Sequence, residues 1–407
     1  MTVEVRPTAS REEFTDAVFG IAQYFGMPPL TDERYERYMR VLPHDRMFAA
    51  WEDGGVVGGA GSFAFVLSVP GGARVPCAGV SAVGVYPTHR RRGVLRSMMR
   101  AQLDDVHARG EPLAALWTVE ETIYGRYGYG IASWCGDIEL PREYNQFARP
   151  FERRGRVRLV EGEEAVEHMP RIWERLMDER PGMFQRPEPW WTDRVVADPE
   201  QRREPGDGPK RFVLYELDAD VRGYAIYRHK PSWGEGVSTA KTAVVEALAV
   251  DPDATRELWR FLLDIDAAAT VEAGSLPPDH PLFLLLASPR RARFRMLDGL
   301  WLRLVDVEAA LSLRSYNGGG PIVFEVADAF CRWNDGRWKL EAGVASRTNE
   351  PPHLRLEADA LASAYLGGIT FRELADAHRV EEVLPDGLAH ADVLFQAPVH
   401  PWCPEVF

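Results

Sequence analysis

The sequence predicts an α/β protein with mixed sheets, in which two tandem domains of one fold precede a smaller α+β domain. Strand-like stretches pass through a basic, glycine-containing turn into a helical pattern at VGVYPTHRRRGVLRSMM, residues 83–99. A second strand-turn-helix unit, VEALAVDPDATRELWRFLLDID, follows at 245–266. The 407 residues suffice for two or three separate cores. We expect domains at 1–150, 151–295 and 296–407.

The elements of the first domain alternate as a mixed sheet requires. Ser10 and Glu13 stand at the spacing of a helix capping box, and apolar side chains then recur at helical spacing as far as Phe25. β-rich stretches follow at 47–51, 56–69 and 75–85. Beyond the basic turn a helical period begins, and PLAALWT returns to a strand. This order predicts a cofactor crevice beside the turn.

The later segments repeat and then change this pattern. Aligned on their prolines, the two strand-turn-helix units set Pro252 beside Pro87 and Leu258 beside Gly93, which indicates a duplicated domain whose second copy lost the basic turn. Asn334-Asp335-Gly336 predicts a hairpin turn between two strands of the third domain. The chain ends in APVHPWCPEVF, an apolar tail that we expect to be docked.

Composition excludes several classes of function. The formal net charge of −13 disfavours nucleic acid and anionic lipid as partners, so a basic cluster indicates a local anion site. The amino-terminal stretch has no apolar leader, and we expect no membrane insertion. Four cysteines lack CxxC or Cys/His spacing, and ten histidines lack HExxH, so we expect a reduced, cytoplasmic protein without a metal.

The basic turn combines a helix start with three arginines and a glycine. Helix starts carry unsatisfied N–H groups and partial positive charge, and a glycine lets phosphate approach these donors. The turn therefore predicts a pyrophosphate held by the amides of residues 91–95, with arginines reaching further phosphate. The preceding Val-Gly-Val, residues 83–85, offers a small-residue edge for an extended ligand. A solvated basic helix start is the alternative that the arginines alone leave open.

Several motifs resemble one enzyme family. The turn resembles the acyl-CoA motif of GCN5-related N-acetyltransferases (GNAT) at Arg90, Gly93 and Leu95, although leucine replaces the usual glycine or alanine at the last position. With IYGRYGYG at 123–130, DGLWLR at 298–303, YLGG and a terminal phenylalanine, the chain is similar to the enhanced intracellular survival (Eis) family along essentially its whole length. The resemblance implies two GNAT folds, a sterol-carrier-protein-like domain, acetyl-CoA as co-substrate of the first fold, and a homo-hexamer. The implied cofactor-binding residues are Val83, Gly84, Val85, Arg90, Arg91, Arg92, Gly93, Val94 and Leu95.

The resemblance also implies the catalytic groups. Acetylation needs a neutral amine, an oxyanion donor and a proton for the leaving thiolate. Tyr124 matches the family's thiolate-protonating tyrosine, and a phenol with a pKa of about 10 is protonated at neutral pH. The terminal carboxylate of Phe407 is implied as the base, with orientation of the amine as its alternative role. Backbone N–H groups of Val83 and Val85 are implied to face the pantetheine arm and the thioester oxygen.

The implied acceptor is a polycationic small molecule of the aminoglycoside type, which would link the protein to antibiotic resistance. Glu405, the terminal carboxylate and the acidic chain favour ammonium groups. Phe25, Tyr38 and Trp117 are candidates for the substrate pocket through cation–π contact, with core packing as the alternative for Phe25 and Trp117. Two other functions stay open: acetylation of protein or peptide lysine, and a non-catalytic regulator that binds CoA or an apolar ligand.

Overall fold

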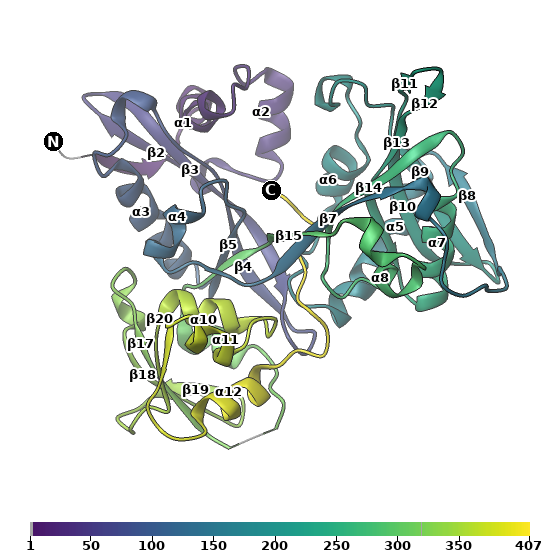
Figure 1. Ribbon diagram of the computed structural model, residues 1–407. Coiled ribbons are helices and arrows are strands. Elements are labelled where there is room, and N and C mark those ends of the chain that lie inside the picture. Colours follow the sequence, from purple (N-terminus) through teal and green to yellow (C-terminus); the bar gives the residue numbers. More distant parts are fainter. Residues whose placement is uncertain (1–2, 319) are drawn as a thin grey trace. The chain divides into compact units, whose positions relative to one another are not determined.

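The computed structural model describes residues 3–318 and 320–407, which divide into two compact units (Figure 1). The first unit joins residues 1–133, 300–401 and 405–407, and the second joins 134–299 and 402–404. The chain therefore leaves the first unit after Ser133 and returns to it at Leu300. The domain boundaries that the sequence suggested at 150 and 295 stay predictions.

The first unit contains a seven-stranded sheet in the order β1-β2-β3-β4-β5-β16-β6. The predicted strands near the amino terminus are confirmed to within a few residues. The strand β16 enters the sheet from far along the chain and pairs antiparallel with both β5 and β6. The bounds of these strands are β1 Glu4–Pro7, β2 Met47–Glu52, β3 Gly55–Ser68, β4 Arg74–Val85, β5 Leu113–Leu116, β6 Gly130–Ile131 and β16 Trp301–Leu304.

The strands β4 and β5 pair along only part of their length. Their parallel pairing covers three positions and ends at Gly79↔Ala115. Just beyond it the register of β4 against β3 slips by one residue, and Ala82 has a φ of 53°. An extra residue of this kind bends and twists a strand. In the described part of the chain, residues 80–85 of β4 consequently have no strand partner on the β5 side.

Two helices cover opposite faces of this sheet (Figure 1). A Cβ built on Gly58 would point to Met98 of α3, whereas one built on the next residue, Gly59, would meet Ala17 of α1. Since successive strand residues face opposite sides, α1 and α3 lie on different faces. The predicted Ser10 cap is confirmed, because its hydroxyl accepts from Glu13 N at 3.2 Å. The helices here are α1 Arg11–Tyr24, α2 Asp32–Met39, α3 Val94–Ala108 and α4 Glu121–Tyr124.

The second unit repeats this plan with a sheet in the order β15-β7-β14-β13-β10-β9-β8. The strands β9 and β10 form a hairpin that pairs Leu217 with Asp220, and the parallel pairing of β13 with β14 again ends early, at Val244↔Ala273. Its strands are β7 Trp134–Pro141, β8 Arg156–Val160, β9 Arg211–Leu217, β10 Asp220–Lys230, β13 Ala240–Ala249, β14 Ala268–Leu276 and β15 Arg295–Asp298. A small hairpin, β11 Trp233–Gly234 and β12 Val237–Ser238, accompanies helices α5 Gly162–Glu179, α6 Glu188–Trp190, α7 Pro252–Leu263 and α8 Leu282–Leu285.

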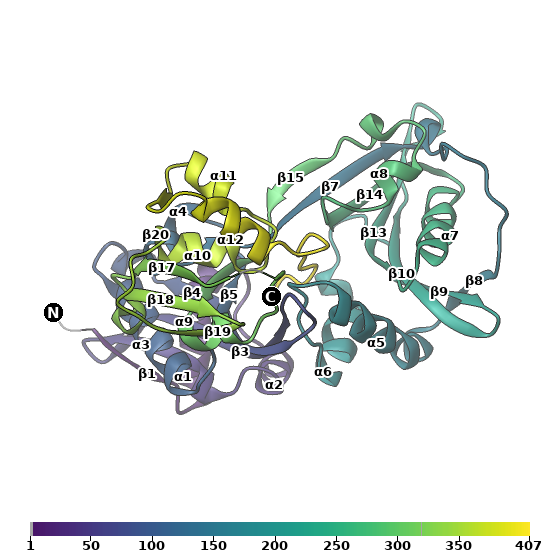
Figure 2. The same ribbon diagram turned by 90° about the horizontal axis from the view of Figure 1, so that it is seen from below.

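The carboxyl-terminal part of the first unit is a five-stranded sheet in the order β19-β18-β17-β20-β21, packed against helices (Figure 2). Phe324 of β17 contacts Phe371 and Phe395 in those helices, with ring centroids 5.5 and 5.7 Å apart. The strands are β17 Ile322–Ala327, β18 Gly336–Glu341, β19 Val344–Arg347, β20 Leu354–Glu357 and β21 Val380–Glu382. The helices are α9 Val307–Ser312, α10 Ala358–Tyr365, α11 Phe371–Asp376 and α12 Gly387–Phe395.

The predicted hairpin turn at residues 334–336 is wrong. The segment before it is a 3₁₀ turn, Arg332–Asn334, and the strand that pairs with β18 is β17. Asn334 is 1% exposed, and its amide donates to the carbonyl oxygens of Leu304 and Val305. The asparagine thus stabilises tertiary contacts instead of a turn. Within the described residues, no helix is both long and apolar enough to cross a membrane.

The contact between α1 and β4 generates a stability prediction. A Cβ on Gly84 would lie 2.6 Å from the carbonyl carbon of Gly20, so Gly84→Ala has to push the backbone of α1 off the sheet. We expect it to lower the free energy of unfolding by about 1–3 kcal/mol, measured by urea denaturation. Gly55→Ala is the control, because a Cβ there approaches only Glu52 O, at 3.9 Å. Equal stability of the two variants would contradict this close approach.

Candidate functional site

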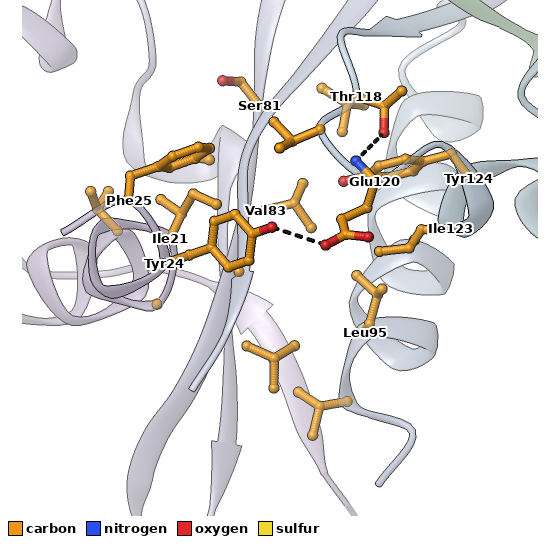
Figure 3. Close-up of a pocket in the computed structure, with 18 of the residues that line it drawn as sticks. Ile21, Tyr24, Phe25, Ser81, Val83, Leu95, Thr118, Glu120, Ile123 and Tyr124 are labelled. Carbon is orange, nitrogen blue, oxygen red and sulfur yellow. Dashed lines mark hydrogen bonds between the residues drawn. The ribbon is translucent and has the colours of Figure 1, made fainter. Parts of the chain in front are cut away.

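A cavity of about 970 Å³ lies in the first unit, where β4 parts from β5 (Figure 3). It is bordered by α1, the end of β4, the start of α3, the segment from β5 to α4, and the last two residues of the chain. Its size is at the upper end of the range for small-molecule pockets. The cavity is therefore large enough to be a ligand site.

Most of the site residues predicted from the sequence line this one cavity. They are Phe25, Tyr38, Val83, Gly84, Val85, Arg90, Arg91, Gly93, Val94, Leu95, Trp117, Tyr124 and Phe407. Arg92 and Glu405 are not among its lining residues: Arg92 donates to Glu52 Oε1 at 3.1 Å, and Glu405 is 8% exposed. Val406 lines the cavity instead of Glu405, whose backbone oxygen accepts from Trp117 Nε1 at 2.6 Å.

The start of α3 is built to leave its backbone donors available. Gly93 is the N-cap residue with a φ of 86°, a left-handed conformation that favours glycine. No side chain caps this helix, and a Cβ on Gly93 would have open space around it. Arginines 90, 91, 96 and 126 line the same cavity. Uncapped N–H groups together with guanidinium groups make a site for phosphate.

The corresponding helix of the second unit lacks such a site. Helix α7 begins directly after Asp251, whose carboxylate accepts from Ala254 N at 2.9 Å and forms an ion pair with Arg222 Nε at 3.1 Å. A carboxylate therefore occupies the position where a phosphate would approach the helix. As the N-cap residue of its helix, Asp251 rather than Leu258 corresponds to Gly93, so the predicted alignment is wrong in register at the helix start.

Tyr124 lies at the end of α4, facing the cavity (Figure 3). Burial disfavours the phenolate and raises the pKa of Tyr124 to about 12. Its ring meets that of Tyr129 edge-on, with centroids 6.0 Å apart. Among the described residues its hydroxyl has no hydrogen-bond partner. Tyr124 is therefore a protonated donor at neutral pH that is available to a ligand.

The loop that carries Tyr124 is fixed by the carboxyl-terminal part of the first unit. Arg303 of β16 is fully buried, pairs with Asp328, and fills the space where a Cβ on Gly128 would lie. A Cβ on Gly130 would overlap the backbone of Asp359 in α10. These glycines let the loop approach its supports closely, and the position of Tyr124 depends on both contacts.

The predicted docking of the tail is confirmed. Trp402 and Cys403 are 7% and 1% exposed. The ring of Phe407 lies edge-on to Phe65 with centroids 5.0 Å apart, and a Cβ on Gly79 would lie 3.3 Å from it. The carboxyl terminus is thus held at the position where β4 leaves β5.

Sequence reasoning missed a hydrogen bond across the cavity. Tyr24 at the end of α1 donates to Glu120 Oε1 at 2.9 Å, and this bond raises the pKa of Tyr24 (Figure 3). The guanidinium of Arg90 lies 5.6 Å from the Tyr24 ring. Nothing in the local sequence pairs these residues, since they come from elements 96 positions apart.

Comparison with known proteins identifies the domains of this chain. Residues 4–132 and 182–304 match models of the acetyltransferase (GNAT) domain, and residues 307–404 match the sterol carrier protein domain. An uncharacterised N-acetyltransferase of Streptomyces coelicolor is 40% identical, with all of both chains covered. The N-acetyltransferase Eis of Mycobacterium tuberculosis is 35% identical over 82% of this chain and 81% of its own. The chain belongs to the Eis family.

The solved structures agree with this membership. The crystal structure of Eis1 from Mycobacterium abscessus has a TM-score of 0.87 and 33% identity, covering 99% of this chain and 100% of its own. The predicted fold class is therefore confirmed: two GNAT domains precede a sterol-carrier-like domain. The predicted enzyme class is confirmed as well, and this member of the Eis family is an N-acetyltransferase.

Acetyltransferases with the GNAT domain use acetyl-CoA, and the residues present in this Eis-family chain fit it. The arginines and uncapped amides at the start of α3 suit its phosphates. The unpaired edge of β4 suits an extended pantetheine arm. Among the described residues, no three His, Cys, Asp or Glu side chains gather closely enough to hold a metal ion.

The buried pair beneath the Tyr124 loop generates a second stability prediction. Arg303→Met leaves Asp328 buried without its cation, so we expect it to lower the free energy of unfolding by about 3–5 kcal/mol. Arg355→Met is the matched control, because Arg355 is half exposed and its partner Glu325 keeps Arg337. We expect the control to lose less than about 1 kcal/mol. Urea denaturation followed by tryptophan fluorescence measures both, and similar losses would contradict the proposed support.

Proposed function

We propose that this protein transfers the acetyl group of acetyl-CoA to a primary amine of a small molecule, by direct attack of the amine on the thioester. The observation that carries the proposal is that one cavity holds an uncapped basic helix start, an unpaired strand edge, a protonated phenol and the terminal residue. Each of these four features supplies one requirement for transfer of an acyl group from a bound co-substrate to a bound amine.

The part of the cavity beside the start of α3 is proposed to bind and orient acetyl-CoA. In the proposal, Arg90 and Arg91 neutralise phosphates while the first amides of α3 donate to the pyrophosphate. Backbone N–H groups of Val83 and Val85 hold the pantetheine arm and the thioester oxygen, since β4 has no strand partner there. Hydrogen bonds to that oxygen strengthen as it gains negative charge in the transition state.

The reaction then needs two proton movements. The neutral amine attacks the carbonyl carbon, and its nitrogen forms a bond to that carbon while the carbonyl oxygen becomes an oxyanion. The carbon–sulfur bond breaks as this oxyanion collapses, and the thiolate takes the proton of Tyr124. The terminal carboxylate of Phe407 takes the proton that the amine nitrogen loses. These roles place the acid and the base within one cavity.

The class of acceptor is proposed from the family resemblance and the net charge alone. A polycation of the aminoglycoside type is the acceptor that the resemblance suggests, and the net charge of −13 supports it. Lysine acetylation and non-catalytic CoA binding are the rivals, and Tyr124 and Phe407 in one cavity favour catalysis over the latter. On the resemblance alone, we also propose that the protein is a cytoplasmic homo-hexamer. Light scattering tests the proposed oligomeric state.

Replacing Tyr124 by phenylalanine tests the proposed acid. We expect Tyr124→Phe to lower kcat for amine-dependent thiol release by about 10²- to 10⁴-fold, while the Kd of acetyl-CoA stays within a few-fold by calorimetry. Because the pKa of Tyr124 is about 12, this group stays protonated up to about pH 10 and causes no loss of wild-type rate below that.

Tyr129→Phe is the control for this substitution, because the Tyr129 hydroxyl is buried, lies outside the cavity lining and has no partner among the described residues. The control is expected to keep its rate. Thiol release by Tyr124→Phe at the wild-type rate would remove Tyr124 from the mechanism, and no thiol release by the wild type with any amine would overturn the proposed function.

Moving the terminal carboxylate tests the proposed base. Two glycines added after Phe407 leave its ring free to stay against Phe65 but displace the carboxylate by several ångströms. We expect kcat to fall by about ten-fold or more, with acetyl-CoA binding unchanged. The same two glycines added before Met1 serve as the control. Full turnover by the extended chain would show that the carboxylate is dispensable.

A further inference from the structure

The last residue of the chain is docked through its ring. Phe63 and Phe65 of β3 stack on each other with ring centroids 5.3 Å apart, and they are 4% and 6% exposed. The ring of Phe407 lies edge-on to both, with centroids 6.3 Å from Phe63 and 5.0 Å from Phe65. Edge-to-face contact is a favourable arrangement of aromatic rings. The side chain at the terminus is therefore held against the sheet.

A hydrogen bond from Trp117 holds the backbone of the same segment. Trp117 follows directly on β5, just beyond the last pair of β5 with β4, and it lines the cavity. Its indole Nε1 donates to the backbone oxygen of Glu405 at 2.6 Å, although the two residues are 288 positions apart. Glu405 is 8% exposed, so little water competes for this bond. The bond lies two residues before the terminal carboxylate.

The docked ring alone does not orient that carboxylate. The ring of Phe407 is joined to its backbone through two rotatable side-chain bonds, so the carboxylate can swing about a ring that stays in place. Two residues of chain span at most about 7 Å, so a fixed carbonyl at Glu405 restricts this swing. A base has to lie within hydrogen-bond reach of the proton that it takes. Two points of attachment, one on the ring and one on the backbone, meet this requirement.

We propose that Trp117 is a positioning residue of the acetyl transfer, and that its indole N–H sets the place of the terminal carboxylate by holding the backbone of Glu405. The inference rests on the proposed function, in which this carboxylate takes the proton that the amine loses. It gives Trp117 a role other than the cation–π contact that the sequence suggested, because the polar edge of its ring is bonded to the tail. Every amine that the enzyme acetylates depends on this bond to a similar degree.

Trp117→Phe keeps an aromatic ring and removes the N–H donor. We expect kcat for thiol release to fall about ten-fold with each accepted amine, whereas KM for the amine and the Kd of acetyl-CoA change less than about three-fold. A tryptophan that contacts the acceptor would give the opposite pattern, with KM raised by different amounts for different amines and kcat kept. Should Trp117→Phe not fold, 3-benzothienylalanine at this position has the shape of tryptophan without its N–H and provides the same test.

Trp333→Phe is the matched control. Its indole Nε1 also donates to a backbone oxygen, that of Val305, at 2.7 Å, and like Trp117 it is half-buried. Trp333 lies outside the cavity lining. We expect this variant to keep the wild-type kcat, so that loss of an indole hydrogen bond as such is separated from loss of the bond to the tail.

A double-mutant cycle with the terminal extension shows whether Trp117 acts through the carboxylate. In the chain extended by two glycines after Phe407, we expect Trp117→Phe to cause no further fall in kcat, because both changes displace the same group. Multiplying losses, an unchanged kcat in Trp117→Phe, an equal loss in Trp333→Phe, or full turnover by the extended chain would each overturn the inference and leave the acetyltransferase standing. No thiol release by the wild type with any amine, although calorimetry detects acetyl-CoA binding, would overturn the proposed function and the inference with it.

Discussion

The separation of β4 from β5 is the constraint on which the rest of the site depends. A strand interior has both backbone edges paired, and there is no room there for a ligand. Here parallel pairing stops at Gly79, and the extra residue near Ala82 turns β4 away from β5. The backbone groups beyond this point need other partners, and an extended ligand can provide them. The cavity, the docked tail and the Tyr124 loop all lie along this opening.

The two GNAT domains share this opening but differ in the helix start that follows it. In the second unit, β13 leaves β14 in the same way after Val244. What differs is the helix that follows. Gly93 has no side chain and a left-handed backbone, so the amides of α3 stay available, whereas Asp251 caps α7 with its own carboxylate. One residue at the N-cap therefore separates a site for phosphate from a closed helix end.

The sequence predicted what local chemistry determines and missed what distant contacts determine. The strands up to Val85, the Ser10 cap and the uncapped helix start at Gly93 follow from period and residue type. Asn334 was misread because its amide bonds to β16 and the residue after it, which no local pattern shows. The entry of β16 between β5 and β6 likewise cannot be read from the local sequence, since its partners lie about 170 to 190 residues earlier in the chain. For the same reason the sequence suggested Glu405 at the pocket, where the docked tail presents Val406.

The sterol-carrier-like domain packs against the loop that carries Tyr124. Arg303 is held by Asp328 from the segment after β17, and α10 lies against Gly130, so both sides of the Tyr124 loop rest on the carboxyl-terminal part of the chain. The same part leads into the tail that ends in Phe407. The acid and the base of the proposed reaction are thus both positioned by a domain that lies outside the co-substrate site. Neither a buried ion pair nor a close contact at a glycine can shift without loss of stability. These contacts therefore constrain the position of the Tyr124 loop. This coupling gives a physical reason for the carboxyl-terminal domain to accompany the first GNAT domain in one compact unit.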